Sequence, residues 1–156
     1  MSKNPLGLSD RIKLTKDQQK RLDVIDQLDL SVEKRAVLAL EACKPRHIDL
    51  LEREFKRFLV LALLVKSDDY RLVPSRPVDA LWHELILNTP KYREFCDKVF
   101  GRYLDHKPEA SRARAQAIYA GEPFAQMRVL LNDAFGAPPE AMWGDPAFCG
   151  PCSEGG

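Results

Sequence analysis

The run Phe58-Leu-Val-Leu-Ala-Leu-Leu-Val65 is the longest apolar stretch of this chain, and it decides the fold class. It closes a segment, about Arg46 to Val65, in which apolar residues such as Ile48, Leu51 and Phe55 recur every three to four positions. This spacing places them on one face of an α-helix. Because the last turns are apolar on every side, we expect other helices to surround this one.

Helical spacing continues on both sides of this segment, whereas sustained alternation typical of strands is absent. On the N-terminal side we expect one helix from about Thr15 to Leu28 and a second from about Ser31 to Cys43, the second carrying Val32, Val37 and Leu40. On the C-terminal side we expect helices at about 77–87, 90–100, 108–120 and 123–135. The sequence therefore predicts an all-α protein, a single compact bundle of about six to seven helices.

Composition supports one domain followed by a short tail. Of the 156 residues, 45% are apolar and 30% are charged, as in ordinary globular domains. We expect residues 1–143 to form the helical domain. From Ala137 onward prolines and glycines replace the helical pattern, so we expect residues 144–156 to form an irregular surface tail that contains cysteine and glycine.

Charge and hydropathy exclude several classes of partner. The 24 basic and 23 acidic residues nearly cancel, which argues against nucleic-acid binding by a clustered basic face. No apolar secretory signal opens the chain, and its longest apolar run is far shorter than the roughly 20 residues of a membrane span. We therefore expect a soluble, cytoplasmic protein whose four cysteines are thiols or metal ligands rather than disulfides.

Chemically active side chains concentrate between residues 79 and 106. Asp79 and His83 are four apart in one expected helix, so their side chains share a face. Cys96 lies in the next expected helix and His106 just after it, and antiparallel pairing of the two helices would bring both toward His83. Two imidazoles, a thiolate and a carboxylate are an ordinary zinc ligand set. Tyr92 is an accessory residue whose hydroxyl would hydrogen-bond a group of this site.

Each of these residues also has a structural interpretation. Asp79 near a helix start offsets the helix dipole. Cys96 on an apolar stripe acts as a small hydrophobic residue. His83 and His106 can each bond to a backbone carbonyl group near a helix end. Because no H-E-x-x-H motif, paired C-x-x-C motif or glycine-rich nucleotide loop is present, the sequence leaves a metal site and a structural cluster both open.

The same region carries a resemblance to a known family. The pattern consists of Val78-Asp79-x-x-Trp82-His83, Thr89-x-x-Tyr92, Cys96, Phe100-Gly101 and His106-x-Pro108. It resembles the glycine-rich domain-containing protein-like family, over roughly residues 50 to 145. This resemblance implies a compact helical domain and gives weight to the Asp79/His83/Cys96/His106 block, but it implies no reaction.

The tail contains Cys149-Gly-Pro-Cys152, which has the same letters as the redox motif of thioredoxins. In thioredoxins the first cysteine opens a helix that lowers its pKa, and no strand or helix signal flanks the motif here. We therefore do not expect thioredoxin-like catalysis. Two cysteines three apart can still chelate one metal, together with Cys96 or His106 or alone at the surface. Cys43 precedes Lys44-Pro45, and we expect it to pack structurally.

The leading hypothesis is a small helical protein that binds zinc through His83, Cys96 and His106, with Asp79 as a ligand or as the group that orients an imidazole. Cys149 and Cys152 would be accessory ligands. The metal would pin two helices together or support binding of an unidentified protein partner. One alternative is a metal-free interaction module. The other is a metal-dependent hydrolase-like enzyme with Asp79 or Glu84 as base.

Overall fold

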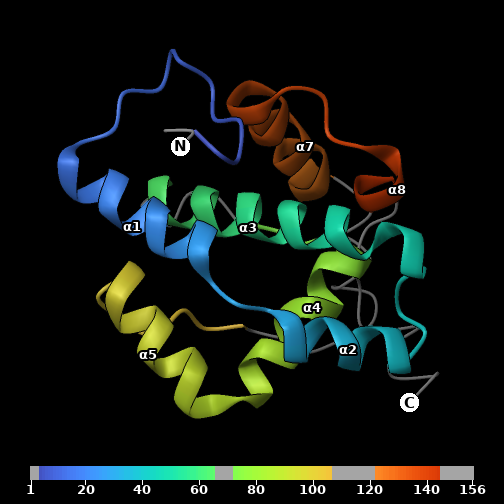
Figure 1. The fold of residues 1–156 in the computed structure, drawn as a ribbon. Helices are drawn as coiled ribbons and strands as arrows, with labels where there is room; N and C mark the ends of the chain where they lie inside the picture. The colour runs from blue at the N-terminus through green and yellow to red at the C-terminus, as the bar shows by residue number, and fades with distance from the viewer. Residues whose placement is uncertain (1–3, 66–71, 107–121, 145–156) are drawn as a thin grey trace.

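The computed structural model describes residues 4–65, 72–106 and 122–144 (Figure 1). Within these ranges the chain is all-α, as predicted, with no strand among the assigned elements. The elements are α1 (Lys16–Gln27), α2 (Ser31–Ala39), the 3-10 helix η1 (Pro45–His47), α3 (Ile48–Leu64), α4 (Arg76–Leu87), α5 (Thr89–Val99), α7 (Glu122–Phe135) and α8 (Glu140–Trp143). The helix expected at 108–120 lies outside the described residues.

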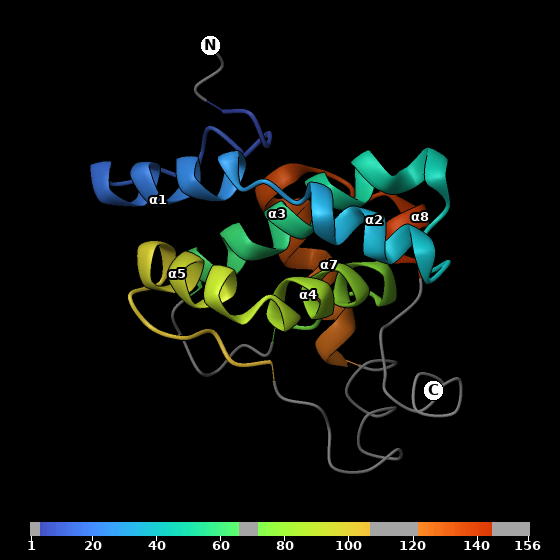
Figure 2. The same ribbon diagram turned by 60° about the horizontal axis from the view of Figure 1, so that its bottom comes forward.

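The central position predicted for α3 is confirmed. In Figure 1 it crosses the middle of the molecule, with α7 and α8 above it and α2, α4 and α5 below it. It packs against α1, α2, α4, α7 and α8, which bury nearly all of its C-terminal half. Figure 2 shows α4 and α5 following one another along the side opposite the N-terminal arm. None of the helices in the described ranges is long and apolar enough to cross a membrane.

The sequence-based expectations for α2 were partly wrong. Val37 is fully buried, but Val32 and Leu40 are 55% and 68% exposed. Ser31 is the first helical residue rather than the cap, and its N–H donates to the Asp29 carboxylate. Only one narrow face of this nine-residue helix packs against α3 and α4, so an apolar residue off that face stays in solvent.

The expectation that helical structure ceases at Ala137 was also wrong. α8 forms over Glu140–Trp143, and Trp143 is fully buried. Its indole Nε1 donates to the buried carboxylate of Glu54 on α3 at 3.0 Å. A helix of one turn after Pro138-Pro139 has too few residues to show periodicity, so only the tertiary contact reveals it.

The N-terminal arm, residues 4–14, covers one end of the core without forming a helix. Leu6 and Leu8 are buried, and Ser9 N–H donates to the carbonyl oxygen of Ala134 in α7 at 2.7 Å. Gly7 has a φ of +78°, and a Cβ added to it would lie 3.0 Å from Nη2 of Arg57. Gly7 is therefore required both by its left-handed backbone and by the close approach of that guanidinium.

Candidate metal site

The start of α4 fixes the first two residues of the site. The Ser75 hydroxyl accepts a hydrogen bond from Val78 N–H, so Ser75 is the helix cap rather than a residue of an ordinary turn. The buried residues of α4, among them Leu81 and Trp82, face the core. Asp79 and His83 are one turn apart on a neighbouring face, which points away from the most buried part of the helix.

The third residue, His106, arrives from the far end of α5. Gly101 has a φ of +68°, and its N–H donates to the Cys96 carbonyl oxygen, which ends the helix in a tight reversal. The chain then runs back past α4. Tyr92 holds this returning segment by donating its hydroxyl hydrogen to the carbonyl oxygen of Leu104.

Trp82 connects this segment to α4. Its indole Nε1 donates to the Tyr92 hydroxyl oxygen at 3.0 Å, as expected for two core aromatic residues with polar atoms. Its ring also packs against the imidazole of His106, with centroids 4.4 Å apart in an edge-on arrangement. The Trp82 ring thus fixes the orientation of the His106 imidazole, which lies outside the described helices.

Asp79, His83 and His106 converge. One ligand atom from each lies within 4.8 Å of the other two. His106 Nε2 makes a short contact with Asp79 Oδ1, and His83 Nε2 lies 3.9 Å from Asp79 Oδ2. The side chains of His106 and Asp79 are only 11% and 17% exposed, whereas that of His83 is 57% exposed. The cluster is therefore largely shielded from solvent at Asp79 and His106 and open to solvent at His83.

Among the described residues, no basic side chain balances the charge of this cluster. Across the described ranges no lysine or arginine pairs with the Asp79 carboxylate, whose assigned partners are the two imidazoles. The arrangement offers two neutral nitrogen donors and one anionic oxygen donor. That combination suits zinc and other first-row transition metals better than calcium or magnesium.

Cys96 does not belong to this cluster. It is fully buried on the apolar face of α5, and burial raises the pKa of its thiol. Burial likewise raises the pKa of the neighbouring Tyr92 hydroxyl. A protonated thiol in an apolar setting packs as a hydrophobic residue. Glu84, named above as an alternative base, is half-buried on α4 and is not among the converging groups either. Cys149 and Cys152 lie outside the described residues.

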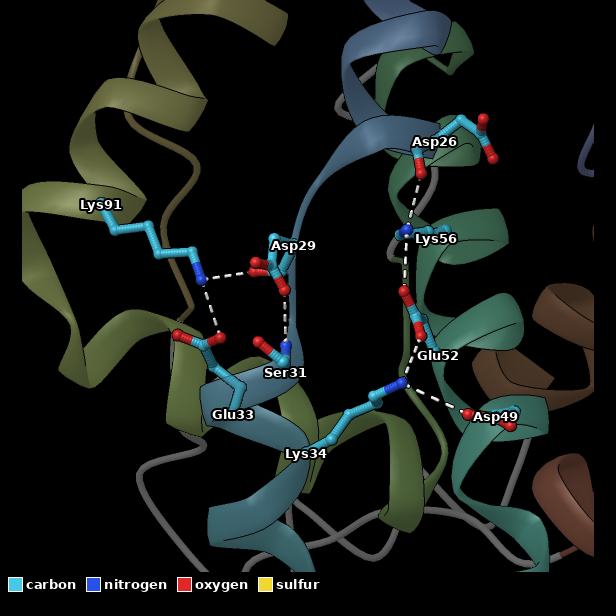
Figure 3. Close-up of polar contacts among 9 residues, drawn as sticks. All are labelled: Asp26, Asp29, Ser31, Glu33, Lys34, Asp49, Glu52, Lys56 and Lys91. Atoms are coloured by element: carbon cyan, nitrogen blue, oxygen red, sulfur yellow. Dashed lines mark hydrogen bonds and ion pairs between the residues drawn. The ribbon is translucent and has the colours of Figure 1, made fainter.

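Sequence patterns did not reveal a second set of polar groups, the ion pairs between α2 and α3. Figure 3 shows Lys34 of α2 contacting Asp49 and Glu52 of α3, while Lys56 donates to both Glu52 and the Asp26 carbonyl oxygen. Every one of these carboxylates has a protein cation beside it. Glu52 and Lys56 are four apart on α3, so helical spacing predicts their contact, but Lys34 comes from α2 and helical periodicity could not pair it with them.

Glu33 at the start of α2 is a partial exception. One carboxylate oxygen receives a hydrogen bond from Lys91 at 2.8 Å, as Figure 3 shows. The other oxygen is buried and has no hydrogen-bond partner in the described part of the chain. The ion pair nevertheless supplies the compensating charge, so this position connects α2 to α5 rather than forming a site.

The comparisons with known proteins place the chain in a family without adding an activity. The model of the UCP032817-like family matches residues 18–121, about two thirds of the chain, including Asp79, His83 and His106. No curated protein and no solved structure matches. The resemblance to the glycine-rich domain-containing protein-like family was therefore wrong, because residues that carried it lie within the match to another family. The chain belongs to the UCP032817-like family.

Proposed function

We propose that this protein binds one divalent transition metal ion, with zinc as the first candidate, through Asp79, His83 and His106. The observation that carries this proposal is the convergence of three ligand atoms within 4.8 Å of one another. Asp79 and His83 belong to α4, whereas His106 lies 23 residues after His83 in a segment that returns to this helix. Two of the three side chains come from one helical turn. The third is positioned by Trp82 and the Tyr92–Leu104 hydrogen bond.

The geometry is close to that of a zinc site. Ligand atoms around one tetrahedral zinc ion lie about 3.3 Å apart, since Zn–N and Zn–O distances are about 2.0–2.2 Å. The 3.9 Å separation of His83 Nε2 and Asp79 Oδ2 is slightly longer, and a small rotation of the exposed His83 side chain closes it. The Asp79–His106 pair makes a short direct contact, so these two side chains would have to move apart to admit an ion between them. Because metal ligands bind in their deprotonated forms, zinc affinity is expected to rise with pH.

The described residues supply three protein ligands, which leaves one coordination position for water, for a residue outside the described ranges or for a group from a partner. Structural zinc sites usually have four protein ligands, whereas sites with three ligands keep an open position. The exposed side of the cluster, next to His83, gives solvent access to that position. A metal held by these three side chains could therefore contact a further group besides the two segments that it joins.

The metal-free interaction module remains the second candidate, because one observation favours it. Asp79 and His106 contact one another directly, and that contact, together with the packing of His106 on Trp82, attaches the segment before His106 to α4. No comparable observation favours the hydrolase. Asp79 is used as a ligand in the proposed site, and Glu84 does not converge with it.

Zinc titration of the full chain, without a histidine tag and after treatment with a chelator, tests the proposal. The Cys149→Ser/Cys152→Ser variant, used as the background, lacks the tail thiols, so the zinc that this variant binds reports on the Asp79/His83/His106 cluster. We expect about one zinc ion per chain by competition with a chromophoric chelator. His83→Ala should abolish this binding, because it leaves only two of the three ligands.

His47→Ala is the matched control, since it removes the one histidine that lies outside the cluster. It should leave zinc binding in this background unchanged. Two results would overturn the proposal: zinc binding that survives His83→Ala, or no zinc binding in the background protein at neutral pH. The second result would leave the metal-free interaction module.

A further inference from the structure

The helix α2 has two apolar faces, and only one of them is covered. Val37, together with Leu30 just before the helix, is buried in the core. The other apolar face consists of Val32, Ala36, Ala39 and Leu40, the residue that ends the helix. Their spacing of four, three and one residues places these side chains on one side of the helix. They form a continuous apolar stripe rather than scattered residues.

This stripe faces solvent. Its two large side chains, Val32 and Leu40, are both more than half exposed, and Ala39 between them is exposed too. Figure 1 shows α2 at the lower edge of the molecule, on the opposite side of α3 from α7. Single exposed apolar residues are ordinary on a protein surface, whereas a contiguous apolar surface marks an interaction site. The stripe on α2 is therefore a candidate surface for another protein chain.

The order of large and small side chains along the stripe is nearly symmetric. Val32 and Leu40 stand at its two ends, about 12 Å apart along the helix axis, and Ala36 lies midway between them. A second α2 that runs antiparallel would place Leu40 of that copy against Val32 and its Ala36 against Ala36. The small side chain in the middle permits a close approach of the two helices. The stripe is thus complementary in shape to itself, as an interface with two-fold symmetry requires.

The charges at the two ends of α2 favour the same arrangement. Asp29 precedes the helix and Lys44 follows it, and both are exposed. Within residues 4–65, 72–106 and 122–144 no ion pair is assigned to either side chain. Asp29 lies seven residues before Ala36 and Lys44 eight residues after it, so antiparallel pairing brings Asp29 of each copy to the same end as Lys44 of the other. Parallel pairing would instead bring like charges and like ends of the helix dipoles together.

We propose that a second copy of this chain binds to the stripe, with the two α2 helices antiparallel around a two-fold axis at Ala36. Each copy contributes one nine-residue helix, so the contact is small and the dimer forms only at high protein concentration. The inference does not depend on the proposed function, because Asp79, His83 and His106 all lie outside α2.

Sedimentation equilibrium of the full chain, with a reductant and a chelator present, tests this inference. The reductant prevents disulfides between copies, and the chelator removes any metal that would bridge them. We expect the average mass of the wild type to rise from that of the monomer toward that of the dimer between about 10 µM and 1 mM protein. A protein that stays monomeric over this range would overturn the inference.

Leu40→Asp tests whether the stripe is the surface involved. It places a charge where apolar side chains lose their water, so association should weaken at least about tenfold. Val129→Asp is the matched control, because Val129 is 58% exposed but lies on α7. It should leave association unchanged. A dimer that survives Leu40→Asp would use another surface and would contradict the proposal.

Two charge reversals test the antiparallel arrangement. Lys44→Glu and Asp29→Lys each bring like charges together at both ends of the dimer, so each variant alone should associate more weakly than the wild type. An equal mixture of the two variants should recover association, because the mixed dimer again has opposite charges at both ends. Asp29→Lys also removes the acceptor for Ser31 N–H, so circular dichroism must show that its helices remain folded. No recovery in the mixture would overturn the antiparallel arrangement.

Discussion

Two carboxylates on neighbouring helices, Glu54 of α3 and Asp79 of α4, have opposite surroundings. Glu54 is fully buried. Its carboxylate accepts hydrogen bonds from Arg53 Nε at 2.9 Å, Arg57 Nη1 at 3.2 Å and the indole Nε1 of Trp143 at 3.0 Å. Asp79 is partly exposed and faces two imidazoles. Glu54 thus has two arginines and an indole N–H as partners, whereas Asp79 has two imidazoles, which are side chains that bind metal ions.

This difference separates a structural charge from a candidate site. A buried carboxylate without compensation is costly, so Glu54 is tolerable only because its arginines and Trp143 surround it. Those partners connect α3 to α8, and Arg57 also reaches the Leu6 carbonyl oxygen of the N-terminal arm. Asp79 has no such set of basic partners in the described residues. What its surroundings lack is a cation.

The largest effect is expected when the compensated carboxylate is removed. Glu54→Gln should lower the free energy of unfolding by about 3–5 kcal/mol, because it leaves buried guanidinium charge without its anion. Urea denaturation measures this change. Asp97→Asn, an exposed position on α5, is the control and should change stability by less than about 0.5 kcal/mol. A loss below about 1 kcal/mol for Glu54→Gln would show that the two carboxylates do not differ in this way.

Supplying the missing cation should stabilise the region around Asp79. In the Cys149→Ser/Cys152→Ser background, zinc at a hundredfold excess over its dissociation constant should add about 2.7 kcal/mol. Thermal unfolding with and without zinc measures this gain. His83→Ala should abolish the gain but change the zinc-free stability by less than about 0.5 kcal/mol, since its side chain is 57% exposed. An equal gain in both proteins would place the zinc elsewhere.

Removing the charge of Asp79 in the absence of metal should have a smaller effect than Glu54→Gln. Asp79→Asn retains the shape but weakens the contact with His106, so we expect a loss of about 1 kcal/mol. Chemical denaturation of the metal-free protein measures this loss. A loss as large as that of Glu54→Gln would mean that the Asp79–His106 pair is as structural as the buried network.

The smallest effect is expected when stability is measured in acid. Burial opposes ionisation of Glu52, but hydrogen bonds from Lys34 and Lys56 outweigh it and hold the pKa of Glu52 below its ordinary value of 4.5. The folded state therefore releases this proton more readily than the unfolded state, and the resulting stability is present above about pH 4.5. It is lost as the pH falls through the lowered pKa.

Urea midpoints measured across this acid range should therefore fall more steeply in the wild type than in Glu52→Gln. The difference in free energy of unfolding is expected to be about 0.5 kcal/mol, because Glu52 is 24% exposed and its ion pairs are screened. Parallel acid profiles for the two proteins would contradict the role assigned to this ion pair.

The periodicity of apolar residues was enough to predict the longer described helices but not α8, nor which helices pack together. The stripe of Ile48, Leu51 and Phe55 and the apolar run after it placed α3 at the centre, because a helix that is apolar all round must be enclosed. Val32 and Leu40 show the limit of that argument. Their spacing is helical, yet both are exposed, because periodicity does not say how wide a face the neighbours will cover.

The candidate site was predictable in part for the same reason. Asp79 and His83 share a face by spacing alone, so their proximity followed from the helix. The approach of His106 depended on the reversal at Gly101 and on packing against Trp82, which spacing does not encode. Cys96 was expected among the same ligands, but its place on the buried face of α5 keeps it out of the cluster.

By itself the sequence determined the all-α class, the central helix and the adjacency of Asp79 and His83, since each follows from local periodicity. Only the tertiary structure decided that His106 joins them and that the indole of Trp143 donates a hydrogen bond to Glu54. These relations connect residues from separate elements. They depend on how helices pack and where the chain reverses, and local propensity carries no information about either.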